Sequence, residues 1–222
     1  MSTVVVVAAH PDDEVLGSGG TLARHVAQGD EVHAVVLSDG ATSRYPSEMT
    51  GVLAESAHKA AAVLGLASVR VGELPDQRLD TVPLIEVTNQ VEAVLDELRP
   101  EFVYTHFPGD ANVDHGLTAR ATWTACRPYV VPRLRRFAVF ETPSSTEWAW
   151  PLADGTFRPA LFVDVSDTLN DKLAAMECYQ SELRDYPHPR SLRALTERAA
   201  FWGSKVGCAA AEPFQVLREV ER

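Results

Sequence analysis

The sequence predicts one α/β domain with a Rossmann-like, mainly parallel sheet and helices on both of its faces. Apolar, β-branched runs alternate along the chain with helical patterns, and such alternation is typical of consecutive βαβ units. The 222 residues are enough to bury one substantial core. We see no repeat, low-complexity tract or clear linker. We therefore expect a single domain over residues 1–222.

The expected strands begin with Val4–Ala8, a continuous apolar run typical of a strand that is buried on both faces. Further strands are expected at Glu31–Leu37, Ser68–Val71, Phe102–Tyr104, Arg136–Phe140 and Leu161–Val165. Helices are expected at Leu16–Gln28, Glu48–Leu64, Leu84–Leu98, His115–Cys126, Asp167–Leu183 and Ser191–Gly203. Ligands of such folds bind beyond the carboxyl ends of the strands, so polar residues there are the first candidates for a site.

Composition argues against several classes of protein. Apolar residues make up 45% of the chain and charged residues 23%, as in ordinary globular proteins. The net charge of −11, without a Lys/Arg-rich run, speaks against nucleic-acid binding. Three widely spaced cysteines without a CxxC pair speak against a disulfide scaffold or a thiolate zinc site. The apolar run near the N-terminus is too short for a signal peptide or a membrane span, and we expect a cytoplasmic enzyme. Homo-oligomer formation stays open.

Two polar loops follow expected strands. His10-Pro11-Asp12-Asp13-Glu14 follows the first strand, and a His- and Asp-rich loop from Thr105 to His115 follows the strand at Phe102–Tyr104. Imidazole and carboxylate suit zinc, and a catalytic zinc takes three protein ligands and keeps one open position. The adjacent Asp12 and Asp13 project differently, so one can bind the metal while the other faces its water. Neighbouring strands would bring both loops to one edge of the sheet.

Two simpler interpretations compete with a metal site. His-Pro-Asp-Asp can be a turn whose aspartate caps a helix. Gly17–Gly20 after a strand can indicate a phosphate-binding loop, but the acidic residues before it would repel phosphate. Gly-x-Ser-x-Gly is absent, which speaks against a serine hydrolase.

Ala9–Glu14 after an N-terminal strand, together with Asp114-His115, resembles the motifs of the LmbE-like, or PIG-L, zinc-dependent N-deacetylases. That family includes N-acetylglucosaminyl-phosphatidylinositol de-N-acetylases and deacetylases of mycothiol, bacillithiol and antibiotic biosynthesis. The resemblance implies removal of the N-acetyl group from an N-acetylglucosamine-type sugar or conjugate. It implies one Zn²⁺ per chain on His10, Asp13 and His115, with Asp12 as the general base and Asp114 as a carboxylate that orients an imidazole.

The substrate-binding residues that the resemblance implies are less closely matched. The family's second motif usually has a histidine three positions before the metal histidine, and this chain has Asn112. Asn112 can donate a neutral hydrogen bond, or it can be a turn residue. Arg44 and Asp76 are the nearest matches to an arginine and an aspartate that hold sugar hydroxyls in the family. Solvated loop charge is the alternative for both.

A third polar cluster, Tyr186–Ser191, lies far from both motifs. His188 stands between two prolines and is rigidly held, so it can donate a proton to the leaving amine or polarise the amide oxygen. The alternative is an exposed loop before a helix capped by Ser191. Arg190 can bind a sugar hydroxyl or a phosphate.

Two functions of other classes stay open on the sequence. A non-catalytic nucleotide-sugar-binding module would need neither metal nor Asp12. A phosphoesterase would need two metals and more carboxylates at the strand ends. The metal content of the protein would separate the three.

Overall fold

The computed structural model describes residues 1–40, 50–150 and 156–221. Within these ranges a seven-stranded sheet has the order β3-β2-β1-β4-β5-β7-β6. The first five strands are parallel: β1 Thr3–Ala8, β2 Glu31–Ser38, β3 Ser68–Leu74, β4 Phe102–His106 and β5 Arg136–Phe140. The last two, β6 Leu161–Asp164 and β7 Ala211–Glu219, extend the sheet in antiparallel pairing. The expected α/β fold with a mainly parallel sheet is confirmed.

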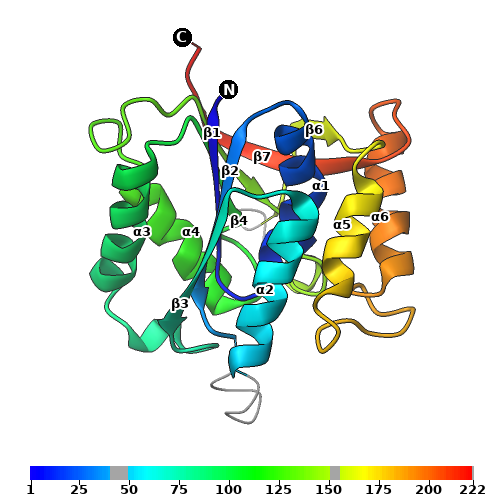
Figure 1. Cartoon of the computed structure of the whole chain (residues 1–222), viewed down its shortest axis with the longest axis horizontal. Coiled ribbons are helices and arrows are strands. Elements are labelled where there is room, and N and C mark those ends of the chain that lie inside the picture. The colour runs from blue at the N-terminus through cyan, green and yellow to red at the C-terminus, as the bar shows by residue number, and fades with distance from the viewer. Residues whose placement is uncertain (41–49, 151–155, 222) are drawn as a thin grey trace.

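Helices cover both faces of the sheet (Figure 1). Helices α3 (Leu84–Leu98) and α4 (Val113–Ala125) lie on one face. The other face carries α1 (Asp13–Ala27), α2 (Thr50–Leu64), α5 (Leu169–Glu177) and α6 (Leu192–Ser204). Two short 3₁₀ turns, Leu79–Thr81 and Thr146–Trp148, lie in loops. Among the described residues, no helix has both the length and the apolar character that crossing a bilayer requires.

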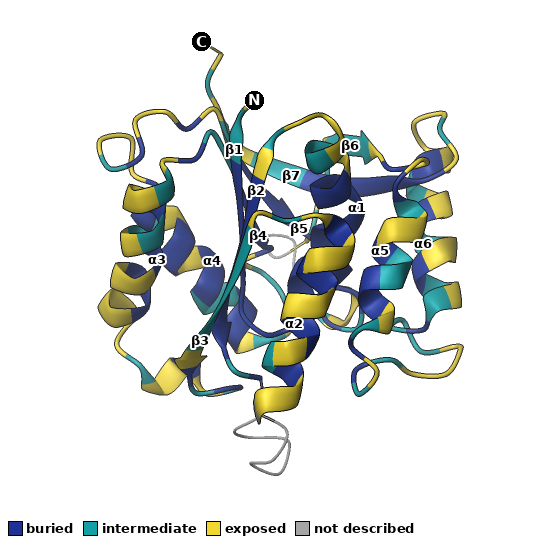
Figure 2. Cartoon of the chain, in the orientation of Figure 1, coloured by how far each residue is buried: buried dark blue, intermediate teal, exposed yellow. Residues whose placement is uncertain are grey.

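The continuous apolar sequence of β1 follows from its burial on both faces of the sheet. Val5 and Val7 pack into the core under α3 and α4, while Val4 and Val6 pack into the core on the opposite face. All four are fully buried, and each such side chain stabilises the fold by roughly 1.5–3 kcal/mol. Figure 2 shows the resulting pattern, with buried central strands, partly buried edge strands β3 and β6, and helices whose exposed residues lie on their outer faces.

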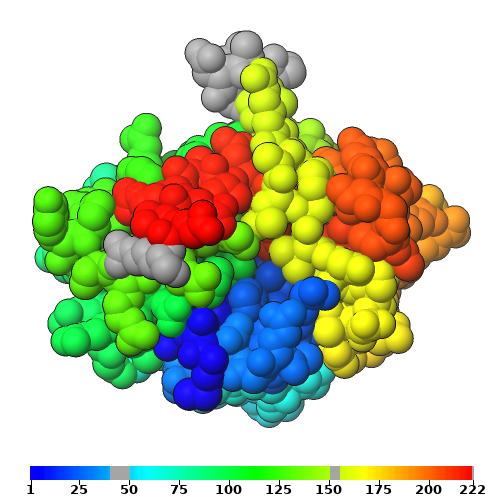
Figure 3. All heavy atoms as spheres, turned by 90° about the horizontal axis from the view of Figure 1, so that it is seen from above, coloured from blue at the N-terminus to red at the C-terminus, as the bar shows by residue number. Residues whose placement is uncertain are grey.

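The order of the strands determines where a site can form. Chain connections run outward from β1 to β2 and β3 on one side, while β4 and β5 lie on the other side. The loops after β1 and β4 therefore diverge at the carboxyl ends of two adjacent strands, which is the position where open α/β sheets bind ligands. The opposite end of the molecule, seen in Figure 3, carries the N-terminal residues in dark blue and the C-terminal residues in red.

Strand β7 and the end of helix α5 differ from the sequence-based expectation. Strand β7 was not predicted, because Pro213 inside it lacks the N–H of a regular strand residue. Helix α5 ends at Glu177, not at Leu183. Just beyond this end the Tyr179 side chain is buried, and its hydroxyl donates to Glu14. Helix α2 begins at Thr50, and the expected start at residue 48 lies outside the described ranges.

Candidate metal centre

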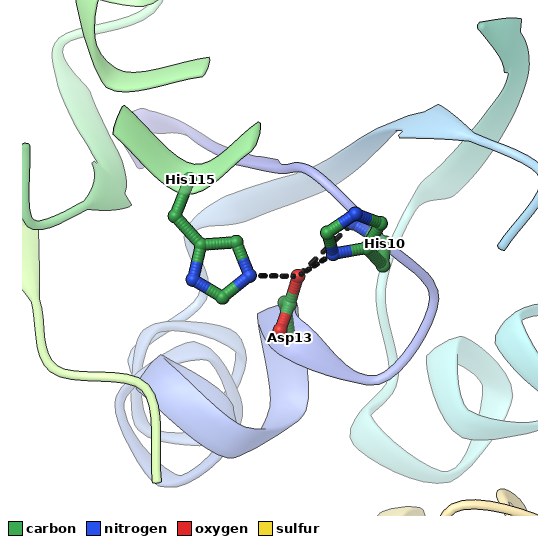
Figure 4. A group of neighbouring side chains, drawn as sticks. All are labelled: His10, Asp13 and His115. Atoms are coloured by element: carbon green, nitrogen blue, oxygen red, sulfur yellow. Dashed lines mark hydrogen bonds and ion pairs between the residues drawn. The ribbon is translucent and has the colours of Figure 1, made fainter. Parts of the chain in front are cut away.

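Three buried side chains from the two diverging loops converge on one point (Figure 4). The Asp13 Oδ2 atom lies 3.1 Å from His10 Nδ1 and 3.3 Å from His115 Nε2. His10 follows β1, Asp13 begins α1, and His115 lies in the first turn of α4. Two imidazole nitrogens and one carboxylate oxygen are a typical protein ligand set for a catalytic zinc. The residues present therefore fit a metal ion.

Carboxylates support the far side of both imidazoles. His10 Nε2 lies 3.2 Å from Asp114 Oδ2, and His115 Nδ1 lies 3.1 Å from Asp110 Oδ1. Such contacts fix the tautomer of a metal-binding histidine and raise its basicity. They direct His10 Nδ1 and His115 Nε2 toward Asp13. Asp114 therefore faces the imidazole of His10, while Asp110 faces that of His115.

Electrostatics at this point favour a cation. Burial opposes protonation of His10, yet the carboxylates of Asp114 and Asp13 raise its pKa to about 10. Burial also opposes ionisation of Asp13, but the imidazoles of His115 and His10 hold the pKa of Asp13 well below its usual range. The group thus gains free energy from positive charge, which a bound metal ion would supply in place of protons.

Asp12 lies beside the three ligands, but its carboxylate faces Arg190 in the segment before α6. Its backbone is in the left-handed region with φ 111°, a conformation that is costly outside glycine and is found at functional sites. The Asp12 N–H donates to Glu14 Oε2 at 3.2 Å. Its Oδ2 accepts from Arg190 Nη1 at 3.3 Å. Burial and the neighbouring Asp13 raise the pKa of Asp12 well above its usual range, while Arg190 opposes that shift.

His106 is close to the group, but both of its ring nitrogens are engaged. Its Nε2 accepts from the Ala9 N–H at 2.9 Å, and its Nδ1 lies 3.0 Å from the Thr142 hydroxyl. The ring stacks on His115 with centroids 4.0 Å apart. Burial and His115 lower the pKa of His106 to about 3, so it is neutral. Because the Nε2 lone pair already accepts a hydrogen bond, His106 supports the centre from behind.

A cavity of about 530 Å³ opens over the three ligands. The residues that the sequence singled out and that line it are His10, Asp12, Asp13, Asp76, Asn112, Asp114, His115, His188 and Arg190. Arg44 lies outside the described residues. The C-terminal cluster therefore does meet the N-terminal motif, although about 175 residues separate Asp13 from His188 in the sequence.

His188 has a defined tautomer. Its Nδ1 accepts from the Arg190 backbone N–H at 3.1 Å, so a neutral ring carries its proton on Nε2. Partial burial and the cations Arg190 and Arg184 lower the pKa of His188. The ring packs edge-on against Trp148, with centroids 6.1 Å apart. His188 is therefore a neutral hydrogen-bond donor at physiological pH.

The remaining candidates are held by local contacts. Asn112 is the N-cap of α4, because its Oδ1 accepts from the Asp114 N–H at 3.0 Å. Its Nδ2 donates to Gln77 Oε1 at 3.2 Å. Asp76 is buried, and its Oδ1 lies 3.5 Å from His10 Nε2. Arg190 Nη1 also donates to Glu182 at 2.8 Å.

Sequence reasoning missed three residues of the site. Asp110, in the same Asp-rich loop as His115, could have been found as a partner for that imidazole. Gln77 has φ 55°, which no sequence signal indicates, and its Nε2 lies 3.0 Å from His10 Nε2. Glu182 falls in what the sequence predicted to be the end of a helix, and only the early end of α5 brings it to Arg190.

Comparison with known proteins agrees with this geometry. The family model described as GlcNAc-PI de-N-acetylase (PIG-L) matches residues 5–126. A 1D-myo-inositol 2-acetamido-2-deoxy-alpha-D-glucopyranoside deacetylase from Mycolicibacterium vanbaalenii is 31% identical over 73% of this chain and 67% of its own length. A 4-oxalmesaconate hydratase from Pseudomonas putida is 30% identical over 83% of this chain and 76% of its own length.

The fold is shared as well. The crystal structure of a conserved protein from Thermus thermophilus superposes with a TM-score of 0.79 at 27% identity, covering 100% of this chain and 97% of that one. The family match includes both loops that supply His10, Asp13 and His115. This chain belongs to the PIG-L family.

Proposed function

We propose that this protein is a zinc-dependent hydrolase that removes the N-acetyl group from an N-acetylglucosamine-type sugar or conjugate. The observation that carries the proposal is the buried His10–Asp13–His115 group, with the carboxylate of Asp12 beside it in one cavity. Family membership and a relative named as a deacetylase of a 2-acetamido sugar support the reaction class.

The roles follow from where each side chain lies. His10 Nδ1, Asp13 Oδ2 and His115 Nε2 would hold one zinc ion. Zinc bound there would lower the pKa of a bound water toward neutrality and polarise the amide carbonyl. Asp12 accepts the proton of the attacking water as the new C–O bond forms. Arg190 holds that carboxylate on the cavity wall, and its charge favours the ionised form that a base requires.

Breakdown of the tetrahedral carbon needs a proton on the leaving nitrogen and stabilisation of the oxygen. Asp12 returns the proton it received, so acetate and a free amine leave and no proton is gained or lost by the side chain. His188, with its proton on Nε2, donates a hydrogen bond to the amide oxygen. Of the two roles that the sequence allowed for His188, the tautomer favours this one, because a neutral imidazole is a weak acid.

Hydration of a carboxylated alkene, the reaction named for the Pseudomonas putida relative, is the second candidate. It would use the same metal group, and the 30% identity to that relative favours it. A polyanionic substrate requires cationic partners, however, and Arg190 is the single Lys or Arg among the described residues that line the cavity. The deacetylase therefore fits the site better.

The test is amine release from a panel of N-acetylglucosaminyl compounds, with metal analysis of the same preparation. We expect about one zinc per chain, amine release that chelation abolishes, and recovery on adding zinc. The Asp12→Asn protein is the matched control, because it keeps all three ligands. Hydration of a dicarboxylic alkene without amine release would establish the second candidate. Absence of metal would favour a non-catalytic sugar-binding module.

A further inference from the structure

The cavity wall carries an excess of negative charge. Six carboxylates of the described residues line it: Asp12, Asp13, Asp76, Asp80, Asp114 and Glu182. Among the described lining residues, Arg190 is the one side chain with a permanent positive charge. A divalent metal ion would offset two of the remaining negative charges, so the loaded site would still be anionic. A cleft lined by one sign of charge focuses its potential on whatever enters.

The positive group of the wall is already committed. Arg190 Nη1 donates to both Asp12 and Glu182, at 3.3 and 2.8 Å. The Nε atom is buried and has no hydrogen-bond partner, so it is not available for a two-pronged contact with a phosphate or carboxylate in the cavity. His188 adds no charge, because its Nδ1 accepts a hydrogen bond from the Arg190 backbone. An anionic substrate would therefore lose its hydration without gaining a cationic partner from the described residues of the wall.

The rest of the wall suits an uncharged sugar. Trp148 is 59% exposed and Val113 62% exposed, and both line the cavity. An aromatic face of this kind packs against the apolar face of a pyranose ring. The carboxylates accept hydrogen bonds from hydroxyl or ammonium groups, which a sugar or amino sugar supplies in quantity.

We propose that this site selects N-acetyl sugars and glycosides that carry no negative charge and discriminates against phosphorylated or carboxylated ones. The proposal rests on the deacetylase function inferred above and specifies its substrate class. It separates this chain from a relative that acts on an anionic compound, and it excludes sugar phosphates and nucleotide sugars as good substrates.

The test compares three N-acetylglucosamine derivatives of different charge with the zinc-loaded enzyme. They are the methyl glycoside (neutral), the 1-phosphate (anionic) and the β-1,4-linked disaccharide of one N-acetylglucosamine and one glucosamine with a free amine (cationic). We expect kcat/KM for the 1-phosphate to be roughly tenfold or more below that for the methyl glycoside at low ionic strength. Added salt should bring the two kcat/KM values closer together, because it screens the repulsion between the wall and the 1-phosphate. Equal or faster turnover of the 1-phosphate would overturn the proposal.

Two charge-reversal variants, one on the cavity wall and one away from it, test whether the wall causes the selectivity. Asp80, exposed on the turn Leu79–Thr81, lines the cavity, whereas Asp96, exposed on α3, does not. Asp80→Lys should raise the ratio of kcat/KM for the 1-phosphate over the methyl glycoside by roughly five- to tenfold. Asp96→Lys changes the net charge equally and should leave that ratio unchanged. Equal responses of the two variants would mean that the wall does not select.

Equilibrium binding to the metal-free wild-type protein distinguishes the failure of this proposal from failure of the function. Calorimetry should show weaker binding of the 1-phosphate than of the methyl glycoside. If no compound is hydrolysed but this order holds, the deacetylase assignment fails and charge selection stands. If hydrolysis occurs and the 1-phosphate binds as well or better, the charge selection is wrong and the deacetylase assignment stands.

Discussion

Two regions of the molecule meet at the cavity, and they are built differently. The loops after β1 and β4 leave adjacent parallel strands and enter helices at once, and all three metal-ligand candidates on them are buried. The segment 178–191 between α5 and α6 contains no helix or strand, and His188 and Arg190 on it are half-buried. Both regions contribute side chains to the same 530 Å³ cavity.

This difference in local structure matches the different precision that metal binding and substrate binding require. A metal centre needs ligands that are positioned to within a few tenths of an ångström, and helix starts with carboxylate support supply that precision. Residues that contact a substrate can lie on an irregular segment, where changes leave the sheet intact. We therefore expect substitutions in the first region to act on metal binding, and substitutions in the second region to act on turnover with the metal retained.

The largest effect is expected for His115→Ala. It removes a ligand, so zinc content should fall far below one per chain and activity should be lost with it. His106→Ala is the matched control, since both of its ring nitrogens are engaged with Ala9 and Thr142. That variant should keep its zinc but lose stability, because the buried Ala9 N–H is left without a partner at a cost of about 1–3 kcal/mol.

Metal analysis and thermal unfolding of the two variants provide the readouts. Loss of zinc from the His106 variant and retention in the His115 variant would reverse the assignment of the third ligand.

Asp12→Asn changes a residue that links the two regions. Asp12 lies on the loop after β1 but contacts Arg190 of the segment 178–191. Asparagine tolerates a left-handed backbone much as aspartate does, so the turn should form. We expect kcat to fall by roughly 10²–10⁴-fold, as for loss of a general base, with zinc content unchanged. Release of the metal would show that Asp12 and Asp13 have exchanged roles.

His188→Ala should lower kcat by roughly 10²–10³-fold, the usual effect of losing one donor to a developing oxyanion. His188→Gln provides an amide N–H in place of the Nε2–H and should recover part of that loss, whereas it could not replace a general acid. Zinc content should be normal in both. Near-normal kcat for the alanine variant would leave His188 as a rigid loop residue beside Trp148.

The sequence was sufficient for the first region because each element there obeys local rules. Val4–Ala8 reads as a doubly buried strand, and a parallel sheet then brings its end next to that of Phe102–His106. Once both loops are expected at one edge, their His and Asp content is enough to predict a metal site. Asp110 lies in the same loop, and its Asp-rich sequence offered it as a candidate partner for His115, but only the path of the loop selects it over the other aspartates.

The second region could not be derived in this way. Residues 178–183 have a helix-compatible sequence, but α5 ends at Glu177 and the buried Tyr179 hydroxyl donates to Glu14 instead. Strand β7 contains Pro213, so local rules argue against a strand that pairing with β5 and β6 nevertheless forms. In both places tertiary contacts override local preference. The Arg190–Asp12 contact, across 178 positions in sequence, has no local signal at all.

The smallest expected effects concern two carboxylates that do not bind the metal themselves, one in each region. Asp110 accepts hydrogen bonds from the Asn112 N–H at 2.8 Å and from Thr146, and it faces His115 Nδ1. Asp110→Asn keeps the shape but removes the charge that orients and polarises that imidazole. Zinc affinity, measured by competition with a chelator, should fall by roughly 10–100-fold, with a smaller change in kcat at saturating metal.

Glu182→Gln is the matched change in the second region, because it also neutralises a buried carboxylate of the cavity wall. Glu182 accepts from Arg190, so its charge acts first on that guanidinium and only through it on Asp12. Zinc affinity should therefore be unchanged within about twofold, since charge effects across a wet cavity are small at this range. If Glu182→Gln weakens zinc as much as Asp110→Asn does, the two regions are one electrostatic unit, and the division between metal holding and substrate contact is wrong.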